Sequence, residues 1–290
     1  MTRTSSDALA TGMSAVRRPG FIALIVAGVG DLTSRRRLIR YLVGADLKRT
    51  HADSVIGQLW WILDPLMQIA VFYVVFTFIF QRSTPDFLLF LFAAILPWKW
   101  FSTTLNDAMN SVVSRQSLIR QLPFPKLVLP TSATLAGTVS FAFGLVALGI
   151  VYLFYLHRLT YWVLTIPLIA GVQLVFTLAV ATALSAANAF YRDVSNVTSH
   201  VLRLWFYLSP VLYPTESLNS LPRGVREVLS LNPFSILLTS YRDVIWGSDH
   251  GAGHAPEFVG LGVLLLISVI LLGLAIAFFK KVEPAFARIL

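Results

Sequence analysis

Hydrophobic residues lie along this chain in long blocks, and polar residues gather in the short segments between them. A helix needs about 20 predominantly apolar residues to cross the hydrocarbon core of a bilayer, whereas strands are much shorter. Six blocks have about that length or more: residues 57–80, 87–112, 128–156, 161–189, 195–213 and 258–279. The pattern predicts an all-α polytopic membrane protein with six transmembrane helices, in which the helices joined by short links are antiparallel neighbours.

Two further segments are apolar but too short to cross a bilayer. Residues 17–30 (RRPGFIALIVAGVG) begin like a signal peptide, but an arginine cluster follows at 35–37 and no small-residue cleavage site is evident. We therefore expect residues 20–50, a rough amphipathic pattern, to lie at the cytoplasmic interface of the membrane. Residues 214–257 contain two apolar pieces hinged at Asn232-Pro233, with the length of re-entrant or interfacial helices.

Composition and charge agree with a membrane protein. The chain is 56% hydrophobic and 13% charged, whereas about 25% of residues are charged in a soluble domain. A net charge of +9 would suggest nucleic acid in a soluble protein, but the basic residues cluster at the ends of the blocks. With six crossings, 17 of the 23 Lys and Arg fall on the side of the N-terminus and five on the other side. Positive residues favour the cytoplasm, so we expect both termini inside and no nucleic-acid partner.

The sequence contains no motif for chemistry of its own. No glycine precedes a lysine, which excludes a Walker-type phosphate loop, and G-x-S-x-G is absent. His250 and His254 stand in a Gly-rich loop without an evident third ligand, so we expect no metal site. We also expect no catalytic residue and no cofactor bound by this chain. Mid-membrane acids of the kind that couple transport to ions are scarce, so a transporter of this kind would take its energy from a partner.

An ordered set of motifs carries a family resemblance. It comprises DLKRTHADSVIGQLWWILDPL (46–66), LPWKWFS (96–102), which is expected to break the second block, LIRQLPFPKLVLP (118–130), NAFYRDVSNV (188–197), FYLSPVLYP (206–214), LNPF (231–234) and FFKKVEPAFARIL (278–290). Residues 35–290 resemble the permease subunit of type-2 ABC exporters for cell-surface polysaccharides, such as O-antigen, capsule and teichoic acid exporters. We expect them to form one membrane domain, with residues 1–34 as a variable cytoplasmic extension.

The resemblance implies a homodimer that binds two copies of a separate ATPase subunit, which would hold ATP and magnesium. It implies outward transfer of a lipid-linked polysaccharide across the bacterial plasma (inner) membrane. In that family the basic N-terminal helix borders the lipid entrance, and the outer loop forms two re-entrant helices. Here the basic residues are Arg35, Arg36, Arg37, Arg40, Lys48 and Arg49.

The resemblance implies that the cytoplasmic loop after the second block contains the helix that docks on the ATPase. Charges surround an apolar knob, and two prolines stop the helix and stiffen the return. An alternative is a loop that lies on lipid. The predicted coupling residues are Arg115, Leu118, Ile119, Arg120, Gln121, Leu122, Pro123, Phe124, Pro125 and Lys126.

Arg192 and Asp193, in the next cytoplasmic turn, have two open interpretations. Asp193 can accept hydrogen bonds from the free N–H groups that start the fifth helix, or the pair can make a second ATPase contact. The fifth block itself is rich in polar residues, which need a protein partner or a water-filled path.

A glycan path needs aromatic walls, because sugar rings stack on aromatic faces as bases do. The candidates are Trp98, Trp100, Phe101, Trp205, Phe206, Tyr207 and Tyr213, with Lys99 among them; an aromatic belt at the interface is the alternative. Lys99 lies ~18 Å along its helix, near mid-bilayer. We expect it to face a water-filled cavity and anionic substrate, with Asp64 nearer the cytoplasmic surface.

Two other functions stay open from the sequence. One is a type-2 ABC permease for a drug or another lipid, and the other is a membrane-embedded glycosyl- or acyltransferase. The enzyme would need a catalytic acid or histidine at the membrane face, and none stands out.

Overall fold

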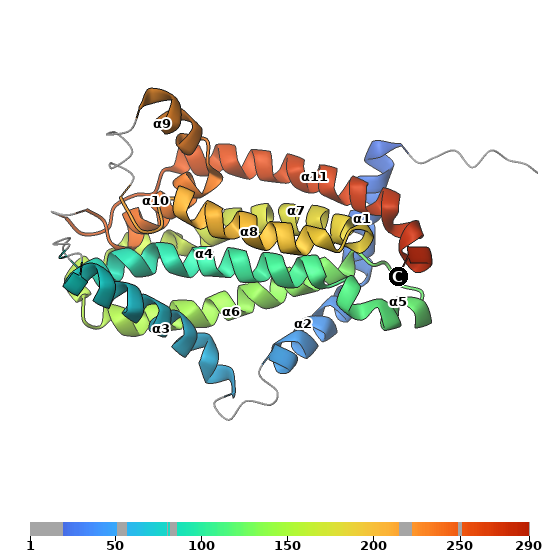
Figure 1. Cartoon of the computed structure of the whole chain (residues 1–290), viewed down its shortest axis with the longest axis horizontal. Coiled ribbons are helices and arrows are strands. Elements are labelled where there is room, and N and C mark those ends of the chain that lie inside the picture. Colours follow the sequence, from blue (N-terminus) through green and yellow to red (C-terminus); the bar gives the residue numbers. More distant parts are fainter. Residues whose placement is uncertain are drawn as a thin grey trace, which may run out of the picture.

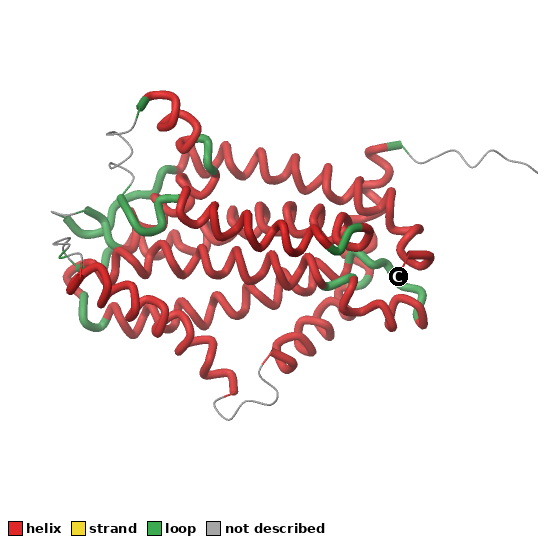
Figure 2. The backbone as a smooth tube through the Cα atoms, viewed as in Figure 1, coloured by secondary structure: helices red, strands yellow, loops and turns green. Residues whose placement is uncertain are grey.

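The computed structural model describes residues 20–50, 57–79, 81, 86–214, 222–248 and 251–289. Residues 1–19 of the predicted N-terminal extension and His250 lie outside this part of the chain. The described residues are mainly helical, with loops between the helices, one isolated bridge between Ser248 and Gly251 and no strand (Figure 2). The prediction of an all-α membrane protein is confirmed.

Eleven α-helices occur within these ranges. They are α1 (Phe21–Ser34), α2 (Arg36–Thr50), α3 (Trp60–Val74), α4 (Phe87–Asn110), α5 (Gln116–Gln121), α6 (Val128–Tyr152), α7 (Ile166–Phe190), α8 (Asp193–Leu208), α9 (Arg223–Ser230), α10 (Pro233–Ile245) and α11 (Phe258–Ile289). A π-helical turn, Val75–Ile79, extends α3, and a 3-10 turn, Tyr161–Thr165, precedes α7.

Five helical segments in the described chain are long and apolar enough to cross a membrane: Trp60–Ile79, Phe87–Asn110, Val128–Tyr152, Tyr161–Phe190 and Phe258–Phe286. The sixth predicted crossing, residues 195–213, is not confirmed. Its helix α8 has 16 residues, or ~24 Å, which is less than the roughly 30 Å of hydrocarbon in a bilayer. The chain leaves the helix at Ser209, next to Pro210, and continues as a turn.

Helix α4 forms the centre of the bundle (Figure 1). In its membrane-spanning window 78% of the residues are buried, against 11% for the segment that begins with α3. It contacts α3, α6, α7, α8 and α10, while α11 packs along α7. Because α4 is surrounded, its apolar residues are needed on nearly every side, which explains the absence of a polar face over its first half.

The predicted break of the second block at LPWKWFS is wrong. Pro97 lies inside α4, and the helix continues past it to Asn110. Proline in a membrane helix is tolerated when neighbouring groups satisfy the backbone around it. Here Gln173 Nε2 on α7 donates to the Pro97 carbonyl over 2.8 Å.

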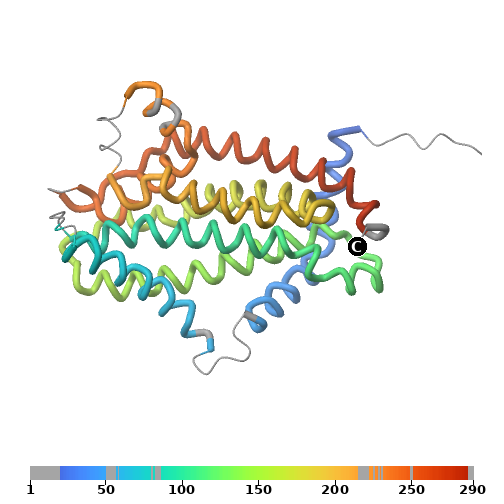
Figure 3. Tube along the Cα trace, viewed as in Figure 1, coloured from blue at the N-terminus to red at the C-terminus, as the bar shows by residue number. Residues whose placement is uncertain are grey.

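Helices α1 and α2 and the end of α11 gather at the same end of the bundle as α5 (Figure 3). Helix α1 crosses α11 closely at Gly28, where a Cβ would overlap the side chain of Ile276. Helix α2 is amphipathic, since Ile39 and Leu42 are buried against the bundle. The predicted basic residues all lie on its exposed side or at its start: Arg35, Arg36, Arg37, Arg40, Lys48 and Arg49.

Candidate functional site

Two grooves flank α3, and we name them after the helix that closes each one. The α6 groove, of about 990 Å³, lies between α2, α3, α4 and α6. The α8 groove, of about 410 Å³, lies between α3, α4 and α8. Both grooves include Lys99 and Asn106 of α4 in their walls.

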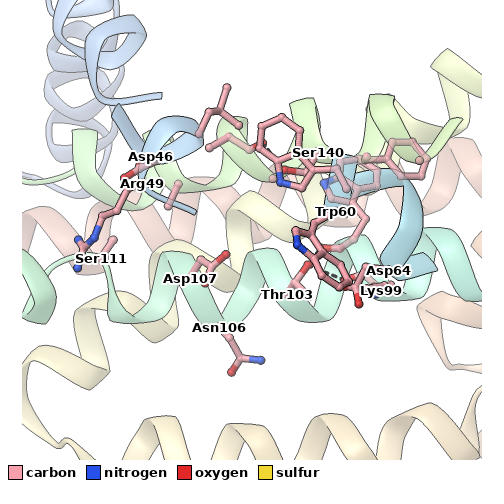
Figure 4. A pocket seen from close by; sticks show the side chains of 18 of the residues that line it. Asp46, Arg49, Trp60, Asp64, Lys99, Thr103, Asn106, Asp107, Ser111 and Ser140 are labelled. Carbon is pink, nitrogen blue, oxygen red and sulfur yellow. Dashed lines mark hydrogen bonds and ion pairs between the residues drawn. The ribbon is translucent and has the colours of Figure 1, made fainter. Parts of the chain in front are cut away.

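The α6 groove has balanced charge. Asp46, Asp64 and Asp107 line it together with Arg49, Lys99 and Arg115. Figure 4 shows Asp46 and Arg49 at one end of this groove, Lys99 with Asp64 at the other, and Asp107 between them.

At the end formed by α2, Arg115 donates to Asp46 in a salt bridge. Burial raises the pKa of Asp46, although the guanidinium groups of Arg115 and Arg49 oppose that rise. Arg115 was predicted to dock on an ATPase, but its side chain is only 15% exposed. The structure uses it to tie the loop after α4 to α2.

The predicted environment of Lys99 needs a correction. Lys99 does line both grooves, but its Nζ also pairs with Asp64 Oδ2 at 2.6 Å. Asp64 was expected nearer the cytoplasmic surface because it stands close to the start of its helix. That expectation is wrong: the first turn of α3 lies midway along the bundle (Figure 1), and the ion pair holds Asp64 beside Lys99 (Figure 4).

The α8 groove has a different lining. Its described walls are Gln68, Phe72, Trp98, Lys99, Ser102, Asn106, Ser199, Leu202, Arg203, Phe206 and Tyr207, so they contain two cations and no acid. Asn106 lines both grooves, and its Oδ1 accepts a hydrogen bond from Ser199 Oγ of α8 at 3.3 Å. This groove therefore offers aromatic faces, hydroxyl and amide groups and positive charge.

The aromatic residues predicted for a glycan path separate into three sets. Trp98, Phe206 and Tyr207 line the α8 groove, and Tyr207 is 67% exposed. Trp100 stacks on Phe141 at 4.3 Å between ring centroids and lines the α6 groove.

The remaining candidates lie away from both grooves. Phe101 is completely buried, and its ring packs against Trp205 and Phe234 in the core. Trp205 is half-buried, and Tyr213 follows α8 in the turn at the other end of the bundle from α5.

The outward face of α8 carries two parallel stripes. One is apolar: Val197, Val201, Leu204 and Leu208. The other is polar: Asn196, His200, Arg203 and Tyr207. Both stripes are exposed in the single chain, and polar side chains cannot face lipid at low cost. The face is suited to a second surface that covers the apolar stripe and leaves water along the polar one.

The coupling loop is a short helix followed by two prolines. Helix α5 ends at Gln121, and Pro123 and Pro125 follow at once. Arg120, Gln121, Leu122 and Pro123 are exposed. The predicted apolar knob is smaller than expected, because Ile119 is buried, Leu118 and Phe124 are half-buried, and Leu122 alone in this loop is a largely exposed large hydrophobic.

Hydrogen bonds to α11, which itself bonds to α1, hold the coupling loop in place. Glu283 Oε1 on α11 accepts a hydrogen bond from the Lys126 backbone N–H at 2.5 Å. Lys280 in turn donates to Glu283 and to Asp31 of α1 at 2.6 and 2.7 Å. The position of the coupling loop therefore depends on α1 and α11.

At the opposite end, Asn232 connects α8 to α10. Its Oδ1 accepts from Trp205 Nε1 at 2.9 Å and from the Phe234 N–H at 3.0 Å, and its Nδ2 donates to Ser209 Oγ at 2.8 Å. The predicted hinge at Asn232-Pro233 is thus the start of α10, with α9 before it. Helix α10 is buried against α4 and α7.

The turn at Arg192 and Asp193 begins α8, and both side chains are exposed. Asp193 stands in the first turn, where a carboxylate is favoured by the helix dipole. Arg192 is the N-cap residue and makes no side-chain capping hydrogen bond, so both interpretations of the Arg192-Asp193 pair stay predictions.

Comparison with known proteins agrees with this architecture. Residues 37–246 match the family described as ABC-2 type transporter. The chain belongs to the ABC-2 type transporter family. It is 33% identical over 261 residues to the O-antigen export system permease protein RfbA of Myxococcus xanthus, covering 90% of this chain and 98% of that protein.

Two further relatives of this ABC-2 chain carry related names. It is 27% identical over 256 residues to the O-antigen export system permease protein RfbA of Klebsiella pneumoniae, with 87% and 95% of the two chains covered. It is 23% identical over 241 residues to the polysialic acid transport protein KpsM of Escherichia coli, with 79% and 87% covered.

Several residues of the ABC-2 chain that hold helices together or line the grooves were not identified from the sequence. Glu283, Asp31 and Asp46 hold elements that are far apart along the chain, and no local pattern indicates such pairs. Arg203 carried a signal, since it is a cation in the middle of an apolar block. Asn106 carried the same kind of signal in the second block.

Proposed function

We propose that this ABC-2 chain is the permease subunit of an ATP-driven exporter that moves a lipid-linked polysaccharide outward across the bacterial plasma (inner) membrane. The observation that carries the proposal is its similarity, over nearly the whole length of both chains, to O-antigen export permeases. The α8 groove agrees with a sugar ligand, because it combines aromatic faces with hydroxyl, amide and cationic groups.

The glycan path of the proposal follows the outward face of α8. Trp98, Phe206, Tyr207 and Lys99 would meet the glycan in the α8 groove. Two copies of the chain would enclose the path between their α8 helices, with the apolar stripe of α8 in the contact between copies. This homodimer is supported by the exposed large hydrophobics of α8, which a single chain leaves uncovered.

The ATPase partner would dock on α5 and the turn after it. Exposed Arg120, Leu122 and Pro123 offer the charge and apolar surface for that contact. Arg192 and Asp193, also exposed in a turn at the end of the bundle where α5 lies, would give a second contact. In this arrangement the ATPase supplies the energy, and this chain has no enzymatic role.

The membrane topology of the proposal has both termini in the cytoplasm and six crossings. The basic residues of α2 would border the lipid entrance. Helix α8 would complete the sixth crossing together with the turn at 209–213. Helices α9 and α10 would then lie at the outer side, with α10 re-entering between the other helices.

Deletion of the gene tests the proposed function. We expect surface polysaccharide to disappear and its lipid-linked precursor to accumulate inside the cell. Expression of the parent chain should restore export, whereas Arg120→Glu should assemble in the membrane but export poorly. Lys48→Glu, a matched charge reversal on exposed α2, should retain binding of the ATPase. Normal surface polysaccharide in the deletion strain would contradict the proposal.

A further inference from the structure

Lys99 is the only cation of the described chain that lines both grooves. Its ammonium group pairs with Asp64 of α3, and its side chain is 23% exposed whereas that of Asp64 is 63% exposed. Asp64 lines the α6 groove but not the α8 groove. Lys99 therefore has an acid partner on one side and an acid-free groove on the other.

The α8 groove has no acid in its described walls, and one of its two cations has no counter-charge. Arg203 lines it and makes no ion pair within the described chain. Asn106 and the hydroxyl groups of Ser102 and Ser199 lie in the same walls. A phosphate ester is the ligand class that matches two cations with neutral hydrogen-bonding groups, because charge-assisted hydrogen bonds to phosphate are strong.

Helix α3 lies at the outside of the described bundle and has few buried residues. Only 11% of the residues in its membrane-spanning window are buried. Pro65 follows Asp64 directly, and a π-helical turn begins at Val75, so the helix has an irregular backbone on both sides of its middle. The Lys99–Asp64 pair joins α3 to α4, together with ring contacts such as Trp61 with Phe143 of α6 at 4.8 Å.

We propose that the α8 groove binds a phosphate group of the exported molecule, and that Lys99 leaves Asp64 for this phosphate and thereby releases α3 from α4. The inference rests on the proposed export function and deepens it, by naming the chemical group that the α8 groove recognises. The anion and Asp64 compete for one ammonium group. Substrate entry and loosening of α3 are consequently one coupled equilibrium.

Phosphate could reach the groove from a lipid diphosphate or from a free phosphate compound. The test uses the full chain in phosphatidylcholine nanodiscs and measures the thermal unfolding midpoint as ligand is added. The arms are polyprenyl diphosphate, polyprenol without phosphate, phosphatidylglycerol and soluble inorganic pyrophosphate. Specific binding raises the midpoint with concentration. We expect polyprenyl diphosphate to raise the midpoint, and polyprenol and phosphatidylglycerol to leave it unchanged. An equal response to pyrophosphate would assign the site to free phosphate and would overturn recognition of the exported molecule.

The variants have opposite expected signs. Lys99→Met should weaken binding by about ten- to a hundredfold, as expected for loss of a charge-assisted hydrogen bond. Asp64→Asn removes the competitor, so it should strengthen binding several-fold. The double variant should bind like Lys99→Met. Asp107→Asn is the matched control. Asp107 is on α4, as Lys99 is, but it lines only the α6 groove, so this variant should bind the ligand like the parent.

Hydrogen exchange tests the release of α3. Ligand should accelerate amide exchange in residues 60–74 relative to α4, although ligands usually slow exchange. Unchanged or slower exchange in residues 60–74 would contradict the release of α3 from α4. Weaker ligand binding by Asp64→Asn would contradict the competition between Asp64 and phosphate for Lys99. If Lys99→Met does not fold, the sign of the Asp64→Asn effect still decides.

The failure of this inference is distinguishable from failure of the proposed function. Loss of surface polysaccharide on gene deletion, with no phosphate-dependent response in the α8 groove, would leave the export function and remove the phosphate site.

Discussion

The α6 groove and the α8 groove share α3, α4 and Lys99, yet they are built differently. The α6 groove is lined by three acids and three bases, and α4 contacts α6 closely at two of its lining residues, Gly137 and Gly144. The α8 groove contains bases without acids, and one of its walls is a helix with an uncovered outer face. Balanced charge and tight packing are suited to holding helices together, whereas uncompensated charge and an open wall are suited to binding something else.

The largest expected effect concerns which end of each groove faces the outside of the cell. An introduced cysteine either reacts or does not react with a reagent added on one side of the membrane. The chain has no native cysteine. Leu231→Cys, at a position 84% exposed before α10, should react with an impermeant thiol reagent in right-side-out vesicles. Arg120→Cys on α5 should react in inverted vesicles alone.

Ser235→Cys is the control for this labelling, because Ser235 lies four positions after Leu231 but is only 7% exposed. It should react poorly from either side. Reaction of Arg120→Cys in right-side-out vesicles would reverse the proposed topology and exchange the inner and outer ends of both grooves.

The close contact of α4 with α6 beside the α6 groove is tested by alanine at three glycines of α6. At Gly137 a Cβ would overlap Thr104 Oγ1 and lie 2.9 Å from Thr104 Cβ, so Gly137→Ala should cost about 1–3 kcal/mol of stability. At Gly144 the overlap is with the flexible end of Leu96, and the cost should be smaller. Gly149→Ala meets no atom within 4 Å and should be neutral or slightly stabilising. Thermal unfolding in nanodiscs measures the series, and equal effects at all three positions would contradict a tight α4–α6 contact.

The next comparison replaces one arginine in each groove by methionine. Arg115→Met leaves the half-buried Asp46 without its salt bridge, so stability should fall by about 1–2 kcal/mol. Arg203→Met, in the α8 groove, should leave the unfolding midpoint nearly unchanged because the side chain is exposed, but it should reduce export. Both unfolding and surface polysaccharide are measured. A stability loss in Arg203→Met equal to that in Arg115→Met would remove the distinction between a structural and a ligand-binding groove.

The smallest effect is a pH dependence confined to the α6 groove. Burial raises the pKa of Asp46 in the folded state, so the ionised carboxylate costs stability above that pKa, and the cost disappears as the pH falls through it. Arg115→Met removes an opposing charge and raises the pKa of Asp46 further. The deficit of Arg115→Met relative to the parent should therefore shrink between about pH 7 and about pH 5, as thermal unfolding would show. A deficit that grows at lower pH would show that Asp46 does not cause it.

Much of the fold follows from local patterns in the chain. Blocks of apolar residues predict helices because a lipid environment requires every backbone group to bond within its own segment. The helix stop at Pro123, the hinge at Asn232-Pro233 and the amphipathic α2 also follow from neighbouring residues, since proline chemistry and helical periodicity act over a few positions. The family resemblance, which rests on the order of such local motifs, is confirmed for the same reason.

Other features depend on how the helices are placed in space. Hydropathy assigned 195–213 to a crossing, but it could not show that α8 ends at Leu208. Phe101 and Tyr207 are both aromatic residues in apolar blocks, yet packing buries one completely and exposes the other. Lys99 meets Asp64 because α3 begins halfway along the bundle, and Glu283 reaches Lys126 across 157 positions of the chain. Such contacts are set by the length, tilt and packing partners of whole helices, which no short stretch of sequence encodes.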